Sequence, residues 1–181
     1  LLSAFEDPNP VMFFEHKALY RSITGNVPDD YYTIPIGKAK ILQEASPDSR
    51  PSSLVTCITY GMGVHWALEI IERNKLDNVE LIDLRSLAPL DTETIFTSVR
   101  KTGKAIVLHE DTLTGGIGGE ISALITENCF EALDAPVMRE GSLDTPADGG
   151  ISSSGKSSSK KSCAETSGTA MPSAPISTLT V

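Results

Sequence analysis

The sequence predicts an α/β domain of three layers, α/β/α, with helices on both faces of a mostly parallel sheet and a disordered C-terminal tail. Short apolar segments alternate with segments of helical periodicity, which is typical of βαβ units. The apolar segments are rich in Val and Ile and lack strict alternation, which favours strands covered on both faces. With 181 residues, of which 40% are hydrophobic, the chain is long enough to bury a substantial core.

Six segments are predicted to be strands because they are short, apolar and bounded by turn residues. They are residues 11–14, 40–43, 54–59, 79–83, 105–108 and 137–139. Between the second and the third lies ASPDSRPSS, residues 45–53, which is predicted to be a polar loop.

Two helices are predicted from apolar residues that fall on one helix face, in the first of them at the spacing i, i+3, i+4 and i+7. The first follows Gly61 and Gly63 and carries on this face Val64, Ala67, Leu68 and Ile71. The other begins near Gly118 or Gly119 and carries Ile121, Leu124, Ile125 and Cys129.

A third helix, between these two, is predicted from the signals at its ends. Asp91 is a good N-cap residue and comes shortly after Pro89. The helix runs to Thr102, where Gly103 ends it.

Charge and hydropathy exclude two classes of partner. The formal net charge is −9, which argues against a nucleic-acid backbone as partner. No apolar segment approaches the roughly 20 residues that a membrane-spanning helix needs. The prediction is therefore no nucleic acid and no membrane.

The three cysteines are widely spaced and have no histidine near them at metal-ligand spacing. Neither a metal site nor a disulfide framework is predicted for Cys57, Cys129 and Cys163. Two of them, Cys57 and Cys129, lie in apolar segments and are predicted to be small core residues in a reducing compartment.

The most unusual stretch is LHEDTLTGGIGGEI, residues 108–121. Its polar residues His109, Glu110 and Asp111 follow a predicted strand, at the carboxyl edge where open α/β sheets bind ligands. A histidine flanked by acids could be held in one tautomer and act as a general base. The alternative is a polar strand end that caps the sheet and receives the next helix.

The glycines of this stretch also allow two interpretations. Backbone N–H groups at a helix N-terminus bind anions, so the turn could hold a phosphate. However, GGIGGEI does not complete G-x-G-x-x-G, because Ile121 stands at the last glycine position counted from Gly116. A tight turn and close packing of strand against helix are favoured over a phosphate site.

The tail differs in charge and composition from the rest. From residue 151 onward its charged residues are Lys156, Lys160, Lys161 and Glu165, so it carries +2, whereas residues 1–150 carry −11. It is rich in Ser, Gly and Pro and is predicted to be disordered. GISSSGKS, residues 150–157, matches the nucleotide-binding pattern G-x-x-x-x-G-K-[ST] but lacks the strand before it and the helix after it, so a chance match is predicted.

Four blocks taken together resemble a known family. They are NPVMFFEHKALYRS (9–22), VELIDLRSLAPLDTETI (79–95), GKAIVLHEDTLTGGIGGEIS (103–122) and APVMREGSLDTP (135–146). In this order and spacing they resemble the beta subunit, or the beta portion of a fused chain, of a thiamine-diphosphate-dependent 2-oxo acid dehydrogenase decarboxylating component. The resemblance covers the branched-chain, acetoin and pyruvate types.

The resemblance implies a division into domains. Residues 1–35 would be the end of an upstream pyrimidine-binding domain and a linker, residues 36–146 a transketolase C-terminal domain, and residues 147–181 the Ser/Gly-rich tail. Thiamine diphosphate and Mg would be cofactors of the parent enzyme, with none bound by this chain alone. The chain would hold no catalytic residue, the nearest candidates being His109 and Glu110, and Arg85 would pair with an acid inside the domain or at a subunit interface.

The implied reaction is oxidative decarboxylation of a 2-oxo acid with acyl transfer to a lipoyl carrier, in an intracellular complex of the bacterial cytoplasm or the mitochondrial matrix. The implied partners are an alpha subunit or fused alpha portion, a second beta chain and a lipoyl acyltransferase component. Docking of the acyltransferase is in doubt, because residues 147–181 lack the Pro- and Phe-containing closing segment of the family. The alternative is a free-standing interaction module that keeps the fold without the chemistry.

Overall fold

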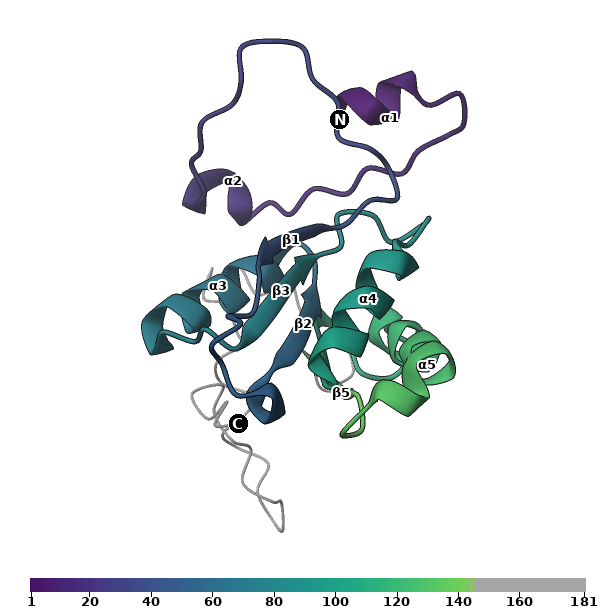
Figure 1. Ribbon diagram of the computed structural model, residues 1–181. Coiled ribbons are helices and arrows are strands. Elements are labelled where there is room, and N and C mark those ends of the chain that lie inside the picture. Colours follow the sequence, from purple (N-terminus) through teal and green to yellow (C-terminus); the bar gives the residue numbers. More distant parts are fainter. Residues whose placement is uncertain (143, 145–181) are drawn as a thin grey trace. The chain divides into compact units, whose positions relative to one another are not determined.

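A five-stranded sheet forms the centre of the computed structural model, which describes residues 1–142 and 144 (Figure 1). Its strands are β1 (Lys40–Gln43), β2 (Val55–Thr59), β3 (Val79–Asp83), β4 (Ala105–Thr112) and β5 (Met138–Ser142). Their order in the sheet is β1-β3-β2-β4-β5. The first strand is antiparallel to its neighbour and the other four are parallel to one another. The predicted mostly parallel α/β fold is confirmed.

Helices cover both faces of this sheet. On one face lies α3 (Met62–Asn74), and on the other lie α4 (Thr92–Thr102) and α5 (Ile117–Cys129). Shorter helical turns are α1 (Leu2–Glu6), α2 (Leu19–Ser22), η1 (Pro51–Ser53) and η2 (Phe130–Ala132). None of the helices among the described residues is long and apolar enough to cross a membrane.

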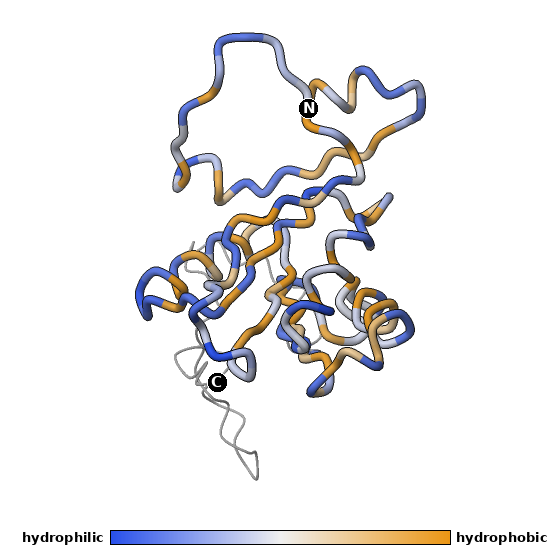
Figure 2. The backbone as a smooth tube through the Cα atoms, viewed as in Figure 1, coloured by the Kyte–Doolittle hydropathy of each residue, from blue (hydrophilic) through white to orange (hydrophobic). Residues whose placement is uncertain are grey.

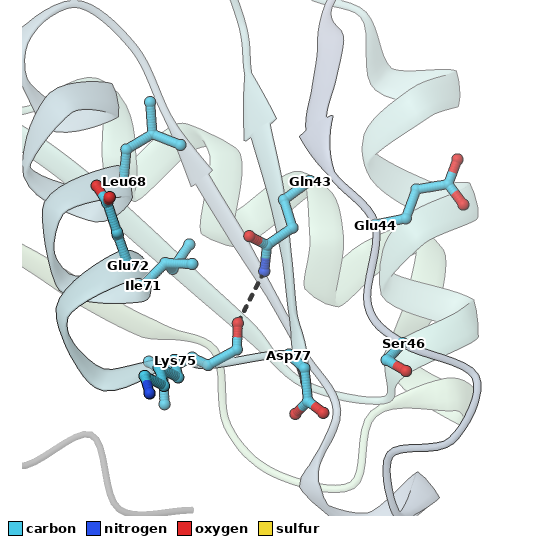
Figure 3. Close-up of a pocket in the computed structure, with 9 residues that line it drawn as sticks. Gln43, Glu44, Ser46, Leu68, Ile71, Glu72, Lys75 and Asp77 are labelled. Atoms are coloured by element: carbon cyan, nitrogen blue, oxygen red, sulfur yellow. Dashed lines mark hydrogen bonds between the residues drawn. The ribbon is translucent and has the colours of Figure 1, made fainter.

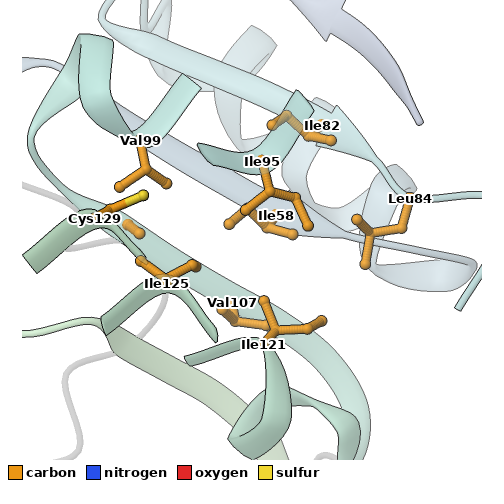
Figure 4. Packing of buried hydrophobic residues seen from close by; sticks show 10 residues of the cluster. Ile58, Ile82, Leu84, Ile95, Val99, Val107, Ile121, Ile125 and Cys129 are labelled. Carbon is orange, nitrogen blue, oxygen red and sulfur yellow. The ribbon is translucent and has the colours of Figure 1, made fainter. Parts of the chain in front are cut away.

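The two sheet faces bury separate apolar clusters, because successive side chains of a strand point to opposite faces. The cluster between α3 and the sheet consists of Val55, Cys57, Ala67, Ile71, Val79 and Leu81. The cluster between the sheet and the helices α4 and α5 consists of Ile58, Ile82, Leu84, Ile95, Val99, Ala105, Val107, Ile121, Ile125 and Cys129 (Figure 4). The predicted helix faces are confirmed where they pack on the sheet, although Leu68 remains partly exposed.

The ends of α4 agree with the prediction. The Asp91 side chain accepts a hydrogen bond from the Thr94 N–H at 3.3 Å, and Gly103 ends the helix in the left-handed conformation with φ 73°. In contrast, Lys75 ends α3 in the same conformation, with φ 51°, although it is not a glycine.

The predicted strand at residues 11–14 is wrong. This stretch has no regular secondary structure and pairs with no strand among the described residues, and its four side chains are 38% to 83% exposed. Figure 2 shows hydrophobic stretches in this N-terminal region as well as along the strands of the sheet. The apolar composition that predicted a strand is present, but no neighbouring strand pairs with it.

Two further differences concern the outer strands and the strand ends. Only the inner strands are covered on both faces, since β1 and β5 lie at the edges and remain largely exposed. Two strands are longer than predicted, because Thr112 of β4 still pairs with Ser142 of β5 after a shift in register. The polar residues 109–111 therefore lie within β4 and not after it.

Candidate functional site at the carboxyl edge of the sheet

The carboxyl edge of the parallel strands is the place where a ligand site is expected. After β2 the chain passes to α3 on one face, and after the neighbouring strand β4 it passes to α5 on the other face. Open α/β sheets bind ligands at such a change of direction. The residues at this point are Tyr60 after β2 and His109, Glu110 and Asp111 in β4.

His109 is buried inside a cradle of glycines. Its side chain is 1% exposed, and neither ring nitrogen has a hydrogen-bond partner among the described residues. A methyl group added at Gly118 would lie 2.3 Å from His109 Nε2, and one at Gly141 or Gly116 would lie 2.9 or 3.0 Å from Cε1. Close packing therefore accounts for these glycines, because only a residue without a Cβ admits the imidazole.

This packing argues against both a general base at His109 and a phosphate site in the glycine-rich turn. Within the part of the chain that the structure describes, no carboxylate forms a hydrogen bond with the imidazole, so the arrangement of a general base oriented by an acid is not formed there around His109. The turn also does not fit the phosphate cradle considered for it, because the His109 ring fills the space against Gly116 and Gly118.

Glu110 has different surroundings, since its side chain is 44% exposed. His16 Nε2, from the N-terminal region, lies 3.3 Å from Glu110 Oε1 and 3.2 Å from Oε2. The neighbouring Asp111 accepts a hydrogen bond from the backbone N–H of Thr112 at 2.7 Å. The three polar residues of β4 thus do not converge on one site.

Tyr60 is a residue of this edge that the sequence analysis did not single out. Burial raises the pKa of its phenol, and the negative charges of Asp111 and Glu110 raise it further. The phenol therefore keeps its proton at neutral pH beside two carboxylates. Its position directly after the predicted strand 54–59 was the available signal.

Asp83 and Arg85 form a second polar group at the same edge. The Arg85 backbone N–H donates to Asp83 Oδ1 at 3.2 Å, and the Arg85 side-chain Nε lies 3.9 Å from Asp83 Oδ2. The expected pairing of Arg85 with an acid inside the domain is confirmed. Burial raises the pKa of Asp83, although the hydrogen bond from Arg85 and the charges of Arg85, His65 and Lys40 oppose this.

The turn between β4 and α5 is held in place by the chain around β5. Arg139 Nη1 donates to the Leu113 carbonyl at 2.8 Å, and the Leu113 N–H donates to the Ser142 carbonyl at 3.2 Å. Asp144 accepts hydrogen bonds from the Thr114 N–H at 3.1 Å and from its hydroxyl, and these bonds lower the pKa of Asp144. The turn is thus a braced structural element.

A groove elsewhere on the domain contains none of these residues. It has a volume of about 630 Å³ and is lined by Gln43, Glu44, Ser46, Leu68, Ile71, Glu72, Lys75, Leu76 and Asp77 (Figure 3). In it the Gln43 amide donates to the carbonyls of Leu76 and Val79, both at 3.0 Å.

Other predicted features can be placed only in part. Over residues 1–142 and 144, no group of three or more His, Cys, Asp or Glu side chains is arranged to hold a metal ion. Cys57 and Cys129 are free and buried, as predicted. Cys163, the GISSSGKS motif and the predicted tail, residues 147–181, lie outside the described residues.

Comparison with known proteins decides the family. The sequence model of the family described as "Transketolase, C-terminal domain" matches residues 37–153. The chain belongs to this family. The His109 cradle and the braced turn lie inside the matched transketolase C-terminal domain, whereas His16 and residues 11–14 precede it.

Curated relatives confirm the resemblance to beta subunits. The chain is 44% identical over 149 residues to "2-oxoisovalerate dehydrogenase subunit beta" of Bacillus subtilis, covering 81% of the chain and 43% of the relative. It is 45% identical over 152 residues to "2-oxoisovalerate dehydrogenase subunit beta 2, mitochondrial" of Arabidopsis thaliana, covering 81% and 39%. It is 40% identical over 147 residues to "Pyruvate dehydrogenase E1 component subunit beta" of Bacillus subtilis, covering 80% and 43%.

A solved structure agrees with the fold. The chain is similar to "Split gene transketolase, inactive beta4 tetramer" with a TM-score of 0.52 and 25% sequence identity, over 68% of this chain and 37% of that one. The chain thus spans about two fifths of the length of the curated relatives it matches.

Proposed function

We propose that this chain is the C-terminal assembly domain of the decarboxylating component of a thiamine-diphosphate-dependent 2-oxo acid dehydrogenase. The whole enzyme would decarboxylate a 2-oxo acid oxidatively and transfer the acyl group to a lipoyl carrier. The observation that carries the proposal is the 44% identity to a 2-oxoisovalerate dehydrogenase beta subunit along 81% of the chain.

The proposed division of the chain places the end of an upstream pyrimidine-binding domain and a linker at residues 1–35. The transketolase C-terminal domain would occupy residues 36–146 and the tail residues 147–181. The exposed apolar side chains of residues 11–14 support this division, because Met12 is 79% and Phe14 83% exposed. Apolar side chains clustered on a surface in this way mark a contact with another part of a protein.

We propose that the chain alone performs no chemistry and binds neither thiamine diphosphate nor Mg, which the whole enzyme would use. His109 and Glu110 would then be structural residues of the domain. The packing of His109 against Gly118 supports this role, since a substrate would have to displace the ring from its cradle.

The proposed partners are an alpha subunit or fused alpha portion, a second beta chain and a lipoyl acyltransferase component. The proposed location is intracellular, in a bacterial cytoplasm or in a mitochondrial matrix. Names of relatives such as the Arabidopsis thaliana beta subunit, which includes the word "mitochondrial", support the second of these places.

Reconstitution tests the proposal. The 181-residue chain would be mixed with the upstream half of the Bacillus subtilis 2-oxoisovalerate dehydrogenase beta subunit and an alpha subunit, with thiamine diphosphate and Mg. We expect decarboxylation of 2-oxoisovalerate by the mixture and none by the chain alone. A matched variant with Phe13→Ser and Phe14→Ser should fail to join the complex, and activity of the isolated chain would refute the proposal.

The alternative is an interaction module that keeps the fold and binds partner subunits without contributing chemistry. The mass of the native protein in its source separates the two possibilities. A species well above 19.3 kDa that extends upstream of Leu1 supports the enzyme part, whereas a native species of 19.3 kDa supports the module.

A further inference from the structure

Residues 1–34 form a loop that closes on itself. The Ser3 hydroxyl donates to the Ile34 carbonyl at 2.5 Å, and the Ile34 N–H donates back to the Ser3 hydroxyl at 2.9 Å. The Tyr31 hydroxyl donates to the Glu6 carboxylate nearby. Figure 1 shows the chain returning to its N-terminus after a wide excursion. Neither α1 nor α2 buries a residue, so the position of this loop depends on its attachments.

The first attachment is the covalent linker that follows the loop. The Gly37 N–H donates to the Ser86 hydroxyl at 3.0 Å, and the Ala39 N–H donates to Asp91 Oδ2 at 3.0 Å. These bonds fix the point where the loop leaves the domain. They leave the direction of the loop open, because a single point of attachment permits rotation about the backbone of residues 35 and 36.

The second attachment is the contact between His16 and Glu110. Among the described residues, every other hydrogen bond or ion pair of residues 1–34 stays within the loop. The contact joins residues 94 positions apart and ends on β4, at the carboxyl edge of the sheet. It is therefore the polar interaction that determines how the loop faces this edge.

The geometry of the contact suits this role. A carboxylate is an acceptor only, so His16 Nε2 must carry the proton. The nitrogen lies at nearly equal distances from both Glu110 oxygens, 3.3 and 3.2 Å, and so fixes the orientation of both side chains. His16 Nδ1 is buried and has no hydrogen-bond partner in residues 1–142 and 144, so within this part of the chain the ring is held from the Nε2 side.

We propose that the His16–Glu110 contact is a lock that fixes residues 1–34 over the carboxyl edge of the sheet. This edge, which open α/β sheets commonly use for ligands, then serves here as a docking surface for the chain's own N-terminal loop. The lock is independent of the enzymatic assignment, since it concerns only the geometry of the chain. It assigns to His16 and Glu110 a positioning role between two segments of the chain.

Spin-label distance measurements on the full 181-residue chain test the lock. One label is placed at Gly25→Cys, where a side chain meets no atom within 4 Å, and the other at exposed Glu69→Cys on α3. Cys163→Ser removes a third thiol, and the two remaining cysteines are buried. We expect one narrow distance distribution for this parent protein.

Removing either partner should release the loop. We expect His16→Ala and Glu110→Ala each to raise the population outside the main distance peak by about 3- to 10-fold, the factor of a partly exposed hydrogen-bonded pair. The double variant should show no further rise. His16→Gln should retain most of the narrow peak, because its amide can still donate to the carboxylate.

The neighbouring carboxylate provides the matched control. Asp111→Asn should leave the distance distribution of the parent unchanged, because Asp111 does not contact His16. Unchanged distributions in both alanine variants, or equal broadening by Asp111→Asn, would overturn the lock. Circular dichroism on each variant confirms that the sheet remains folded, so loss of the peak reports on the loop alone.

Discussion

Removing the Asp91 side chain should destabilise the domain through the loss of several hydrogen bonds at once. It is 4% exposed and accepts three hydrogen bonds, from the Thr94 N–H at 3.3 Å, the Thr94 hydroxyl at 2.9 Å and the Ala39 N–H at 3.0 Å. Asp91→Ala removes the N-cap of α4, which costs about 1 kcal/mol. It also leaves the Ala39 N–H without an acceptor, which costs about 1–2 kcal/mol more.

The free energy of unfolding should therefore fall by about 2–3 kcal/mol, and the melting temperature by about 5–10 °C for a domain of this size. Urea denaturation followed by circular dichroism measures the first quantity. Glu93→Ala is the matched control, because Glu93 is exposed and forms an ion pair with the exposed Lys38, at 3.7 Å. A loss below about 0.5 kcal/mol for Asp91→Ala, the usual range of surface substitutions, would refute the reasoning.

The same side chain predicts a pH dependence. Burial raises the pKa of Asp91, but the hydrogen bonds from Ala39 and Thr94 and the charge of Lys38 outweigh it, so the net shift is downward. A carboxyl with a lowered pKa in the folded state stabilises the fold above its unfolded pKa of about 3.9, and this stability is lost as the pH falls through the folded value. The difference between the natural protein and Asp91→Ala should be constant from about pH 5 to 8 and shrink below about pH 4. A difference that is the same at pH 7 and pH 3 would contradict this assignment.

Three further predictions concern buried groups. Lys101→Met should lower the free energy of unfolding by about 2–4 kcal/mol in urea titrations, because Glu80 is 2% exposed and loses its ion-pair partner. The double variant with Glu80→Gln should recover most of the loss, and no recovery would contradict the pairing. Gly118→Ala should lower the free energy of unfolding by about 1–3 kcal/mol in the same assay, since the added methyl group would lie 2.3 Å from His109 Nε2. The loss should be clearly smaller in a His109→Ala background, and an equal loss in both backgrounds would argue against the cradle. Burial raises the pKa of the Cys57 thiol to about 12, so iodoacetamide at pH 8 should alkylate Cys57 only after the chain is unfolded in urea. Mass spectrometry of the Cys57 peptide measures this, and rapid alkylation of the native chain would contradict the burial.

Most of the fold could be predicted because its signals are local. The cap at Asp91, the stop at Gly103 and the apolar spacing along α3 each depend on a few neighbouring residues, and the structure agrees with them. The apolar segments of β2 and β3 were placed within one residue for the same reason. At residues 11–14 the apolar composition is typical of a strand, but no neighbouring strand among the described residues pairs with this stretch, and the predicted strand did not form.

The candidate site could be predicted in composition but not in arrangement. The sequence places His109 and Glu110 next to each other, yet one is buried among glycines and the other is exposed beside His16. A local sequence pattern does not predict on which face of the sheet each side chain of β4 lies, because the register of this strand shifts between Leu108 and Thr112. The importance of Tyr60 likewise depends on carboxylates about 50 residues later in the chain.

The sequence by itself therefore determined the class of fold, the positions of most elements and, through four sequence blocks, the resemblance to a family. Only the tertiary structure decided the strand order, the antiparallel edge strand, the glycine cradle and the contact that joins His16 to Glu110. The physical reason is the distance along the chain between the residues that each feature requires. Helix periodicity and capping are satisfied within a few residues, whereas register, burial and long-range pairing depend on segments that meet only when the whole chain has folded.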